Sequence, residues 1–331
     1  MEWWPVVLVV VVALGFTYTN GFHDAANAVA TSIATKALTP RIALGLAALM
    51  NLLGAFAGMR VAETIGNDIV AIPVGGVGVT ICVAALLGAT TWNLLTWWRG
   101  MPTSSTHALV SGLAGAALAG GATVQWEGLR DKVAVPTVLS PVVGLVGGLL
   151  LMTLVFWLFR RAAPGPTARR FRYAQTVSAS AMAFGHGMQD ATKSAGVVAL
   201  ALVATGHRDA TETAVPLWAL ALSAVVLALG TYAGGWRIIR TLGRGISHLD
   251  PPQGFAAETT AATILYVATA TGAPISTTHT ITAAILGVGT ARSPREVRWG
   301  TARRILLAWV LTVPGAGLAA AAVTLVVVPV L

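Results

Sequence analysis

The sequence predicts an all-α polytopic membrane protein with two inverted-topology repeats of about five hydrophobic segments each and with broken or re-entrant helices at the midplane. Composition is the first reason: of 331 residues, 56% are hydrophobic and only 10% are charged, whereas soluble domains carry about 25% charged residues. Mean hydropathy is +0.76. The apolar runs suit helical spans of about 20 residues and are too continuous for the alternating strands of a barrel.

The apolar segments follow one another with short polar breaks. They cover residues 5–35, 42–62, 75–98, 103–124, 136–159, 173–204, 214–234, 253–272, 275–291 and 305–331. Segments 5–35 and 173–204 exceed one straight crossing and carry acidic residues midway, so we expect them to be interrupted or strongly tilted. Glycines 21, 185 and 187 are expected to loosen the helices there. The first run is predicted to be a mature span because it lacks a basic start and a small-residue cleavage site.

The basic residues are the second reason, because they gather in three linkers. The formal net charge is +9, and arginines crowd residues 160–172, 237–244 and 292–304. This distribution is a positive-inside pattern and does not indicate nucleic-acid binding. If each segment crosses once, all three linkers lie on one side. We therefore expect a multi-pass protein of the inner (plasma) membrane with an external N-terminus and a cytoplasmic central linker.

Internal repetition is the third reason. Asp24-Ala-Ala-Asn27 matches Asp190-Ala-Thr-Lys193 at a displacement of 166, and Pro102-Thr-Ser-Ser-Thr-His107 matches Pro274-Ile-Ser-Thr-Thr-His279 at a displacement of 172. The first repeat is predicted over residues 1–159, the basic linker over 160–172 and the second repeat over 173–331. Because five segments is an odd number, the two halves insert with opposite orientation, which is a transporter architecture.

The two hydroxyl phrases, residues 102–107 and 274–279, each precede a small, apolar, helix-like stretch. Hydroxyls and free backbone N–H groups at a helix start form a positively polarised pocket that holds oxyanions. Two copies of the phrase indicate one ligand that is bound from two sides. His107 and His279 close the phrases, and we favour a bracing role for them over a ligand role.

The acidic motifs point to a coupling cation. A carboxylate at the bilayer centre costs about 2.5 to 3.5 kcal/mol, so it needs a partner or a use. Asp24 and Asn27 share a helix face and offer oxygens to a hard cation or a proton. Lys193 stands where the first repeat has Asn27, and an ammonium there would repel sodium, which favours proton coupling. Glu258 is either a proton carrier or a buried structural acid. His23 and His186 support these motifs.

Four motifs in order resemble the inorganic phosphate transporters of the Pit family, in its bacterial form. They are Gly21-Phe-His-Asp-Ala-Ala-Asn-Ala-Val-Ala-Thr31, the phrase at 102–107, and residues 186–196 and 273–287. The resemblance implies a non-enzymatic, cofactor-free, homodimeric symporter that takes up phosphate with H⁺ or Na⁺. It also implies that phosphate is bound by Ser104, Ser105, Thr106, Ser276, Thr277 and Thr278. The coupling ion is implied to bind at Asp24, Asn27 and Asp190, which would hold sodium if the protein is sodium-coupled.

Several alternatives stay open. Sulfate competes with phosphate as the substrate, sodium competes with the proton, and phosphate can travel as a metal-phosphate complex. A divalent-metal transporter would use the histidines and aspartates as ligands, and this interpretation gives the six clustered hydroxyls no ligand to bind. A membrane enzyme acting on phospholipid needs a nucleophile with its base, and no such constellation is evident. The sequence also leaves open whether segments 103–124 and 275–291 cross the bilayer or re-enter.

Overall fold

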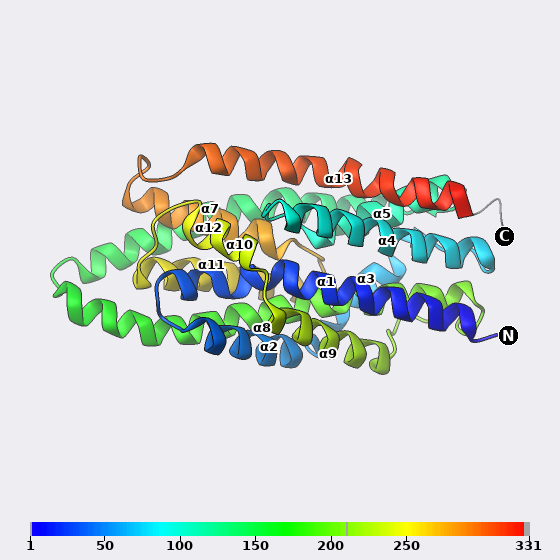
Figure 1. Cartoon of the computed structure of the whole chain (residues 1–331), viewed down its shortest axis with the longest axis horizontal. Coiled ribbons are helices and arrows are strands. Elements are labelled where there is room, and N and C mark those ends of the chain that lie inside the picture. The colour runs from blue at the N-terminus through cyan, green and yellow to red at the C-terminus, as the bar shows by residue number, and fades with distance from the viewer. Residues whose placement is uncertain (1, 210, 328–331) are drawn as a thin grey trace.

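The computed structural model describes residues 2–209 and 211–327, which are helical over most of their length. Figure 1 shows the helices running along one long axis. The first half of the chain contributes α1 (Trp4–Ala34), α2 (Pro40–Ala55), α3 (Met59–Asn67), α4 (Gly76–Trp98), α5 (Ser105–Ala119), α6 (Trp126–Gly128), the π-helical turn η1 (Leu129–Ala134) and α7 (Val135–Phe159). Strands β1 (Val70–Ala71) and β2 (Thr123–Val124) form a short antiparallel pair in which Val70 faces Val124.

The second half repeats this order of helices, and its described residues contain no strand. It contains α8 (Pro164–Ala204), α9 (Leu217–Ala233), α10 (Trp236–Arg244), α11 (Pro251–Ala270), α12 (Thr277–Arg292) and α13 (Trp299–Val327). The predicted linker 160–172 is only partly a loop. Because α8 begins at Pro164, its arginines at 169, 170 and 172 lie on exposed faces of a helix that extends beyond the rest of the molecule (Figure 1).

The described residues contain four helices long and apolar enough to cross a membrane, namely α1, α4, α6–α7 and α13. Two further spans are formed if each bent pair counts as one: α2 and α3 meet at 65°, and α9 and α10 at 71°. The all-α polytopic class is therefore confirmed. The three arginine-rich stretches lie in one half of the molecule, at the left of Figure 1, and α1 begins and α13 ends at the opposite end.

Helices α5 and α12 begin in the middle of the molecule and run toward opposite ends (Figure 1). They have 15 and 16 residues, which corresponds to about 22–24 Å at 1.5 Å per residue and is shorter than a bilayer core of about 30 Å. Each is the returning arm of a hairpin, α5 after α4 and α12 after α11. The two hydroxyl phrases therefore lie at hairpin tips inside the protein.

Of the two alternatives for segments 5–35 and 173–204, interruption or strong tilt, interruption is wrong. They form the unbroken helices α1, of 31 residues, and α8, of 41 residues, and the bends occur in the α2–α3 and α9–α10 pairs instead. The glycines that suggested flexibility permit close packing. A methyl group on Gly21 would collide with the main chain of α9 at Gly230, and one on Gly187 would collide with the main chain of α2 at Asn51.

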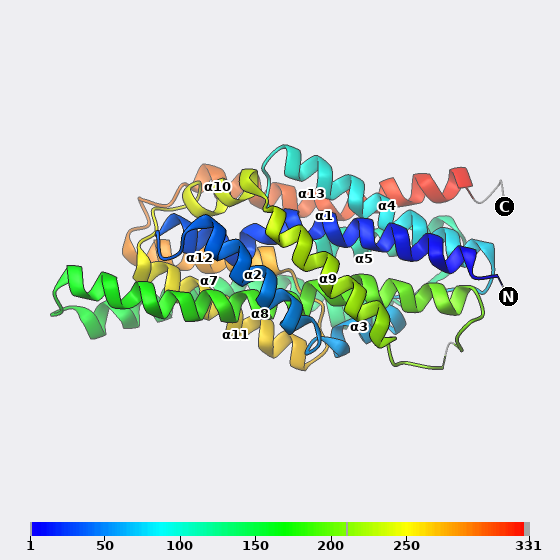
Figure 2. The ribbon, with the colours of Figure 1, turned by 60° about the horizontal axis from the view of Figure 1, so that its bottom comes forward.

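The contacts between the two halves occur in matching pairs of helices. Helix α1 packs against α9 and α8 packs against α2, while α5 packs against α13 and α12 packs against α7. Figure 2 shows α2 and α9 side by side where these contacts meet. The short helix that follows the hydroxyl phrase in each half consequently packs against the last helix of the other half.

Candidate functional site

The N-termini of α5 and α12 meet at the centre of the protein. Each is capped by the first serine of its phrase: Ser104 Oγ accepts from the His107 N–H and Ser276 Oγ accepts from the His279 N–H, both at 3.1 Å. The Thr106 hydroxyl donates to the Ile275 carbonyl at 3.1 Å and joins the two tips. All six residues predicted to bind the anion are buried here, namely Ser104, Ser105, Thr106, Ser276, Thr277 and Thr278.

This arrangement suits an oxyanion. The first N–H groups of a helix have no partner within the helix, and the partial positive charge of each N-terminus adds to them. Two such termini converge on one place from opposite directions, and the hydroxyls beside them donate as well as accept. The geometry therefore brings together the two copies that the sequence places about 170 residues apart.

Helix α1 supplies a carboxylate and an amide to the same place. The Ser105 hydroxyl donates to Asp24 Oδ2 at 2.5 Å, and Asp24 Oδ1 lies 2.7 Å from His23 Nδ1 and 3.4 Å from the Thr278 hydroxyl. The Asn27 amide donates to the hydroxyl oxygens of Thr278 at 2.8 Å and Thr277 at 3.1 Å. The predicted cation residues of the first repeat thus contact both hydroxyl phrases directly.

Helix α8 supplies the matching residues of the second repeat. Lys193 Nζ lies 2.9 Å from Asp190 Oδ1 and donates to the Ser105 hydroxyl at 2.8 Å. His186 Nε2 lies 3.2 Å from Asp190 Oδ2. Lys193 is fully buried, so it does not snorkel to a surface. The ammonium instead bridges the carboxylate of one repeat and the hydroxyl phrase of the other.

Oxygen and nitrogen atoms in this centre can hold a cation. One ligand atom from each of Asp24, His186 and Asp190 lies within 4.8 Å of the others, and all three residues are buried. Asn27 Oδ1 is buried without a hydrogen-bond partner. Buried polar atoms are normally paired, so this carbonyl oxygen, unpaired among the residues that the structure describes, fits a cation or proton that arrives from outside the protein.

The remaining predicted histidines lie around this centre. His23 Nε2 is 3.1 Å from the Thr96 hydroxyl of α4. His107 and His279 pack edge to face with ring centroids 4.6 Å apart, and His279 stacks on Trp309 of α13 at 3.8 Å. These contacts place both phrase-ending histidines behind the hairpin tips, against other side chains.

Glu258 does not join the central group. It lies in a separate buried cluster in which Oε1 accepts from Thr31 at 2.5 Å and from Gln175 at 3.1 Å, while Oε2 accepts from Ser178 at 2.5 Å. Thr31 belongs to α1, one turn beyond Asn27. Sequence reasoning missed the three partners because isolated polar residues in apolar helices carry no motif.

Sequence reasoning also missed Gln189, whose side chain holds the loop before α12. Its Oε1 accepts from the Ile275 N–H at 3.1 Å, and its amide donates to the Ala273 carbonyl at 3.2 Å and to the Thr269 hydroxyl at 2.9 Å. Gln189 matches His23 at the displacement of 166. Its place beside Asp190 in a repeated motif is the signal that identifies it.

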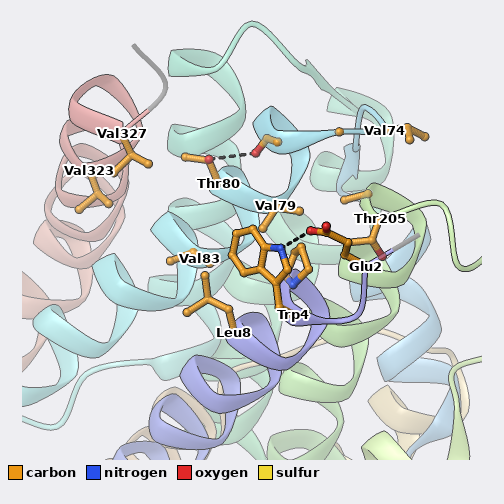
Figure 3. Close-up of a pocket in the computed structure, with 14 residues that line it drawn as sticks. Glu2, Trp4, Leu8, Val74, Val79, Thr80, Val83, Thr205, Val323 and Val327 are labelled. Carbon is orange, nitrogen blue, oxygen red and sulfur yellow. Dashed lines mark hydrogen bonds between the residues drawn. The ribbon is translucent and has the colours of Figure 1, made fainter. Parts of the chain in front are cut away.

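An apolar cavity of about 460 Å³ lies far from this chemistry, between the start of α1, the start of α4 and the end of α13. Figure 3 shows Trp4, Leu8 and Val83 on its walls and the hydrogen bond from the Trp4 indole to Glu2 at 2.6 Å. It shares no residue with the acidic or hydroxyl motifs, so its size does not make it the candidate site.

Comparison with known proteins identifies the family. The sequence profile described as "Phosphate transporter family" matches residues 20–170 and 160–320. The chain belongs to this phosphate transporter family. The resemblance seen in the four motifs is thus confirmed, and the family is one of transporters, not enzymes.

Relatives of this transporter cover almost its whole length. A "Probable low-affinity inorganic phosphate transporter" of Rhizobium meliloti is 47% identical over 315 residues, which cover 94% of this chain and 93% of the relative. A protein of the same description from Bacillus subtilis is 42% identical over 310 residues, 93% of this chain and 92% of its own. A solved structure titled "The sodium-dependent phosphate transporter" matches with a TM-score of 0.88 and 25% identity, covering 99% of this chain and 100% of that one.

Proposed function

We propose that this transporter carries inorganic phosphate into the cell by symport with a proton, and that phosphate binds between the N-termini of α5 and α12. The observation that carries the proposal is the meeting of two capped helix N-termini with six hydroxyl residues. Lys193 Nζ at 2.8 Å from Ser105 Oγ adds one full positive charge to that place. We assign no cofactor and no chemical conversion to the protein.

Charge favours a coupling ion. Asp24 and Asp190 bring two negative charges, Lys193 brings one positive charge, and two helix N-termini together bring about one positive equivalent. A phosphate dianion leaves about two negative charges in excess in a buried centre, where unpaired charge is costly. A cation must therefore enter with the phosphate.

The ammonium of Lys193 is the reason for preferring the proton. It occupies the place that Asn27 has in the first repeat and already pairs with Asp190 at 2.9 Å. Sodium would need oxygen ligands where this ammonium lies. A proton needs only a basic oxygen, and Asp24, with hydrogen-bond contacts at both carboxylate oxygens, is the acceptor we propose.

Proteoliposomes with separately imposed gradients test the coupling. With a pH gradient and no sodium we expect labelled phosphate to accumulate, and with a sodium gradient at constant pH we expect equilibration only. Asp24→Asn should abolish the accumulation driven by the pH gradient while phosphate exchange persists. Accumulation driven by sodium at constant pH would overturn the proton proposal.

Sodium coupling is the second candidate, and two observations favour it. The matching solved structure is titled as sodium-dependent, and the buried Asn27 Oδ1, which has no hydrogen-bond partner among the described residues, is an oxygen that suits a hard cation. The triad Asp24, His186 and Asp190 also suits a metal ion carried together with phosphate. Uptake with and without a chelator, after addition of Mg²⁺ or Zn²⁺, tests that form of the substrate.

Phosphate is preferred to sulfate because the site contains an acceptor. Hydroxyl and amide donors bind both tetrahedral anions, whereas only phosphate carries a proton near neutral pH, and a carboxylate such as Asp24 accepts it. We expect excess sulfate to leave labelled phosphate uptake nearly unchanged. Strong competition by sulfate would reverse the choice of substrate.

We also propose the arrangement in the membrane. The paired contacts of α1 with α9 and α8 with α2 support two inverted repeats, over residues 1–159 and 173–331. The end that carries the arginine-rich connections is proposed to face the cytoplasm of a plasma membrane, with the N-terminus outside. A homodimer is the proposed assembly. Labelling of single cysteines introduced at the two ends tests the orientation, and light scattering in detergent tests the dimer.

A further inference from the structure

A second cavity, of about 400 Å³, lies at the tip of the α4–α5 hairpin. Its floor is the loop from Arg99 to Pro102, which leads directly into the first hydroxyl phrase. Its walls include Thr241 of α10, and Thr301 and Arg304 of α13. These elements reach the arginine-rich end of the molecule, so the cavity lies between that end and the hairpin tip.

The two arginines of this cavity have no acidic partner. Among the residues that the structure describes, neither Arg99 nor Arg304 forms an ion pair, and no Asp or Glu lines the cavity. Arg304 donates to the Thr301 hydroxyl at 3.4 Å, and the Arg99 guanidinium lies over the ring of Trp98, at 5.8 Å. Two unpaired guanidinium groups, with the Thr301 hydroxyl beside them, are the donor set that binds phosphate oxygens.

The cavity is tied to the first hydroxyl phrase by hydrogen bonds. The Thr241 hydroxyl donates to the Gly100 carbonyl at 2.8 Å, and the Trp309 indole donates to the Pro102 carbonyl at 3.0 Å. The loop that forms the cavity floor is therefore the same loop that orients Thr103 to Thr106. An anion in the cavity and an anion at the central site are separated by this loop.

The arginine in the loop that borders this cavity has no counterpart in the second repeat. The displacement of 172 that relates the hydroxyl phrases places Thr271 opposite Arg99. The loop before the second phrase therefore carries a neutral hydroxyl where the loop before the first phrase carries a guanidinium. The two mouths of the site differ in charge, although the phrases themselves are nearly alike.

We propose that this cavity is a second phosphate site, at the cytoplasmic mouth, where Arg99 and Arg304 hold phosphate after it leaves the central site. The inference rests on the proposed function and adds a separate exit site to it. The central anion meets hydroxyls and one ammonium, whereas the mouth offers two solvated guanidinium groups. Phosphate therefore meets one more full positive charge at the mouth than at the centre as it moves toward the cytoplasm. Solvent at the mouth keeps its binding there weak.

Vesicles of both orientations test the site. Cells that lack other phosphate transporters yield right-side-out and inside-out vesicles, and phosphate counterflow is measured in each. For Arg99→Gln combined with Arg304→Gln we expect the KM for phosphate to rise about fivefold or more in inside-out vesicles, the size expected for about 1 kcal/mol. The KM in right-side-out vesicles should stay within about twofold of the wild type.

Two matched variants control the experiment. Arg303→Gln removes a neighbouring exposed arginine that does not line the cavity, and it should leave both KM values unchanged. Arg99→Lys with Arg304→Lys retains the charge and should restore most of the affinity. An unchanged KM in inside-out vesicles, an equal rise in both orientations, or an equal effect of Arg303→Gln would each overturn the proposal.

The source of the bound phosphate group is tested in proteoliposomes of phosphatidylcholine alone. If the double variant loses its defect there, the cavity binds the headgroup of an anionic lipid and the exit site is wrong. If the defect persists, free phosphate is the ligand. Failure of the proposed function is distinguishable, because wild-type vesicles would then take up no labelled phosphate in either orientation.

Discussion

Arg60 and Arg237 hold equivalent main-chain carbonyls on opposite hairpins. Arg60 of α3 donates to the Ala270 carbonyl at 2.6 Å, and Arg237 of α10 donates to the Trp98 carbonyl. Ala270 and Trp98 are the last residues of α11 and α4 and differ by the displacement of 172 that relates the hydroxyl phrases. One turn further along α3 and α10, Thr64 and Thr241 also donate to equivalent main-chain carbonyls.

These threonines lead to the first prediction, on loop position. Thr64 donates to the Gly272 carbonyl at 2.7 Å, as Thr241 donates to that of Gly100. Thr64→Val leaves that carbonyl without its donor, which costs about 1–3 kcal/mol when the group is buried. Because the loop carries the second hydroxyl phrase, we expect the KM for phosphate uptake to rise several-fold. Thr263→Val, at an exposed threonine of α11, is the control; equal kinetics in both variants would contradict the role.

Ser105 carries the second prediction, because its hydroxyl lies between two charged groups. It donates to Asp24 at 2.5 Å and accepts from Lys193 at 2.8 Å. Hydrogen bonds to charged groups contribute about 1.5–3 kcal/mol each, so Ser105→Ala should lower phosphate affinity by about tenfold or more. Ser111→Ala, on the same helix, should be neutral. Uptake kinetics over a range of phosphate concentrations measure both; wild-type affinity in Ser105→Ala would remove it from the site.

The buried pair of Lys193 and Asp190 gives the third prediction, on stability. Both side chains are fully buried, and removing one partner of such a pair costs about 3–5 kcal/mol because the other charge stays uncompensated. Lys193→Met and Asp190→Asn should each lower the unfolding temperature in detergent. The double variant should be more stable than either single variant. Strictly additive losses would show that the two charges do not depend on each other.

Glu258 gives the fourth prediction. Its carboxylate accepts three hydrogen bonds, and Glu258→Gln replaces one acceptor oxygen by a donor that faces another donor. If Glu258 passes the coupling proton, this variant should lose accumulation under a pH gradient and keep phosphate exchange, and Glu258→Asp should recover part of the accumulation. If Glu258→Gln loses phosphate exchange together with accumulation, Glu258 is a structural acid and does not pass the coupling proton.

The sequence predicted the fold class and most of the central site because repetition marks them. Asp24, Asp190 and the two hydroxyl phrases recur at nearly constant displacement, so the proposed inverted repeats predict that the two copies converge. The unbroken course of α1 and α8 could not be predicted, because the same glycines that weaken a helix also permit contact with a neighbouring main chain. That distinction depends on α9 and α2, which the local sequence does not contain.

The supporting contacts were harder to predict than the motifs. Arg60-Val-Ala-Glu-Thr64 and Arg237-Ile-Ile-Arg-Thr241 do repeat, but at a displacement of 177, which differs from those of the motifs. Their partners are backbone carbonyls, which leave no trace in a sequence. The cluster around Glu258 has no repeat at all, since the displacement of 172 places the apolar Leu86 opposite it.

The central claim is that one tetrahedral anion binds between the N-termini of α5 and α12, and anomalous diffraction from arsenate tests it most directly. Arsenate has the shape and charge of phosphate and scatters anomalously. Crystals grown at saturating arsenate should show one strong peak within about 4 Å of the hydroxyls of Ser105 and Thr277, because each hydroxyl bonds to an oxygen of the anion and not to its arsenic atom, and this peak should weaken in Ser105→Ala. Absence of a peak between the two helix starts, under conditions in which arsenate inhibits phosphate uptake, would contradict the account.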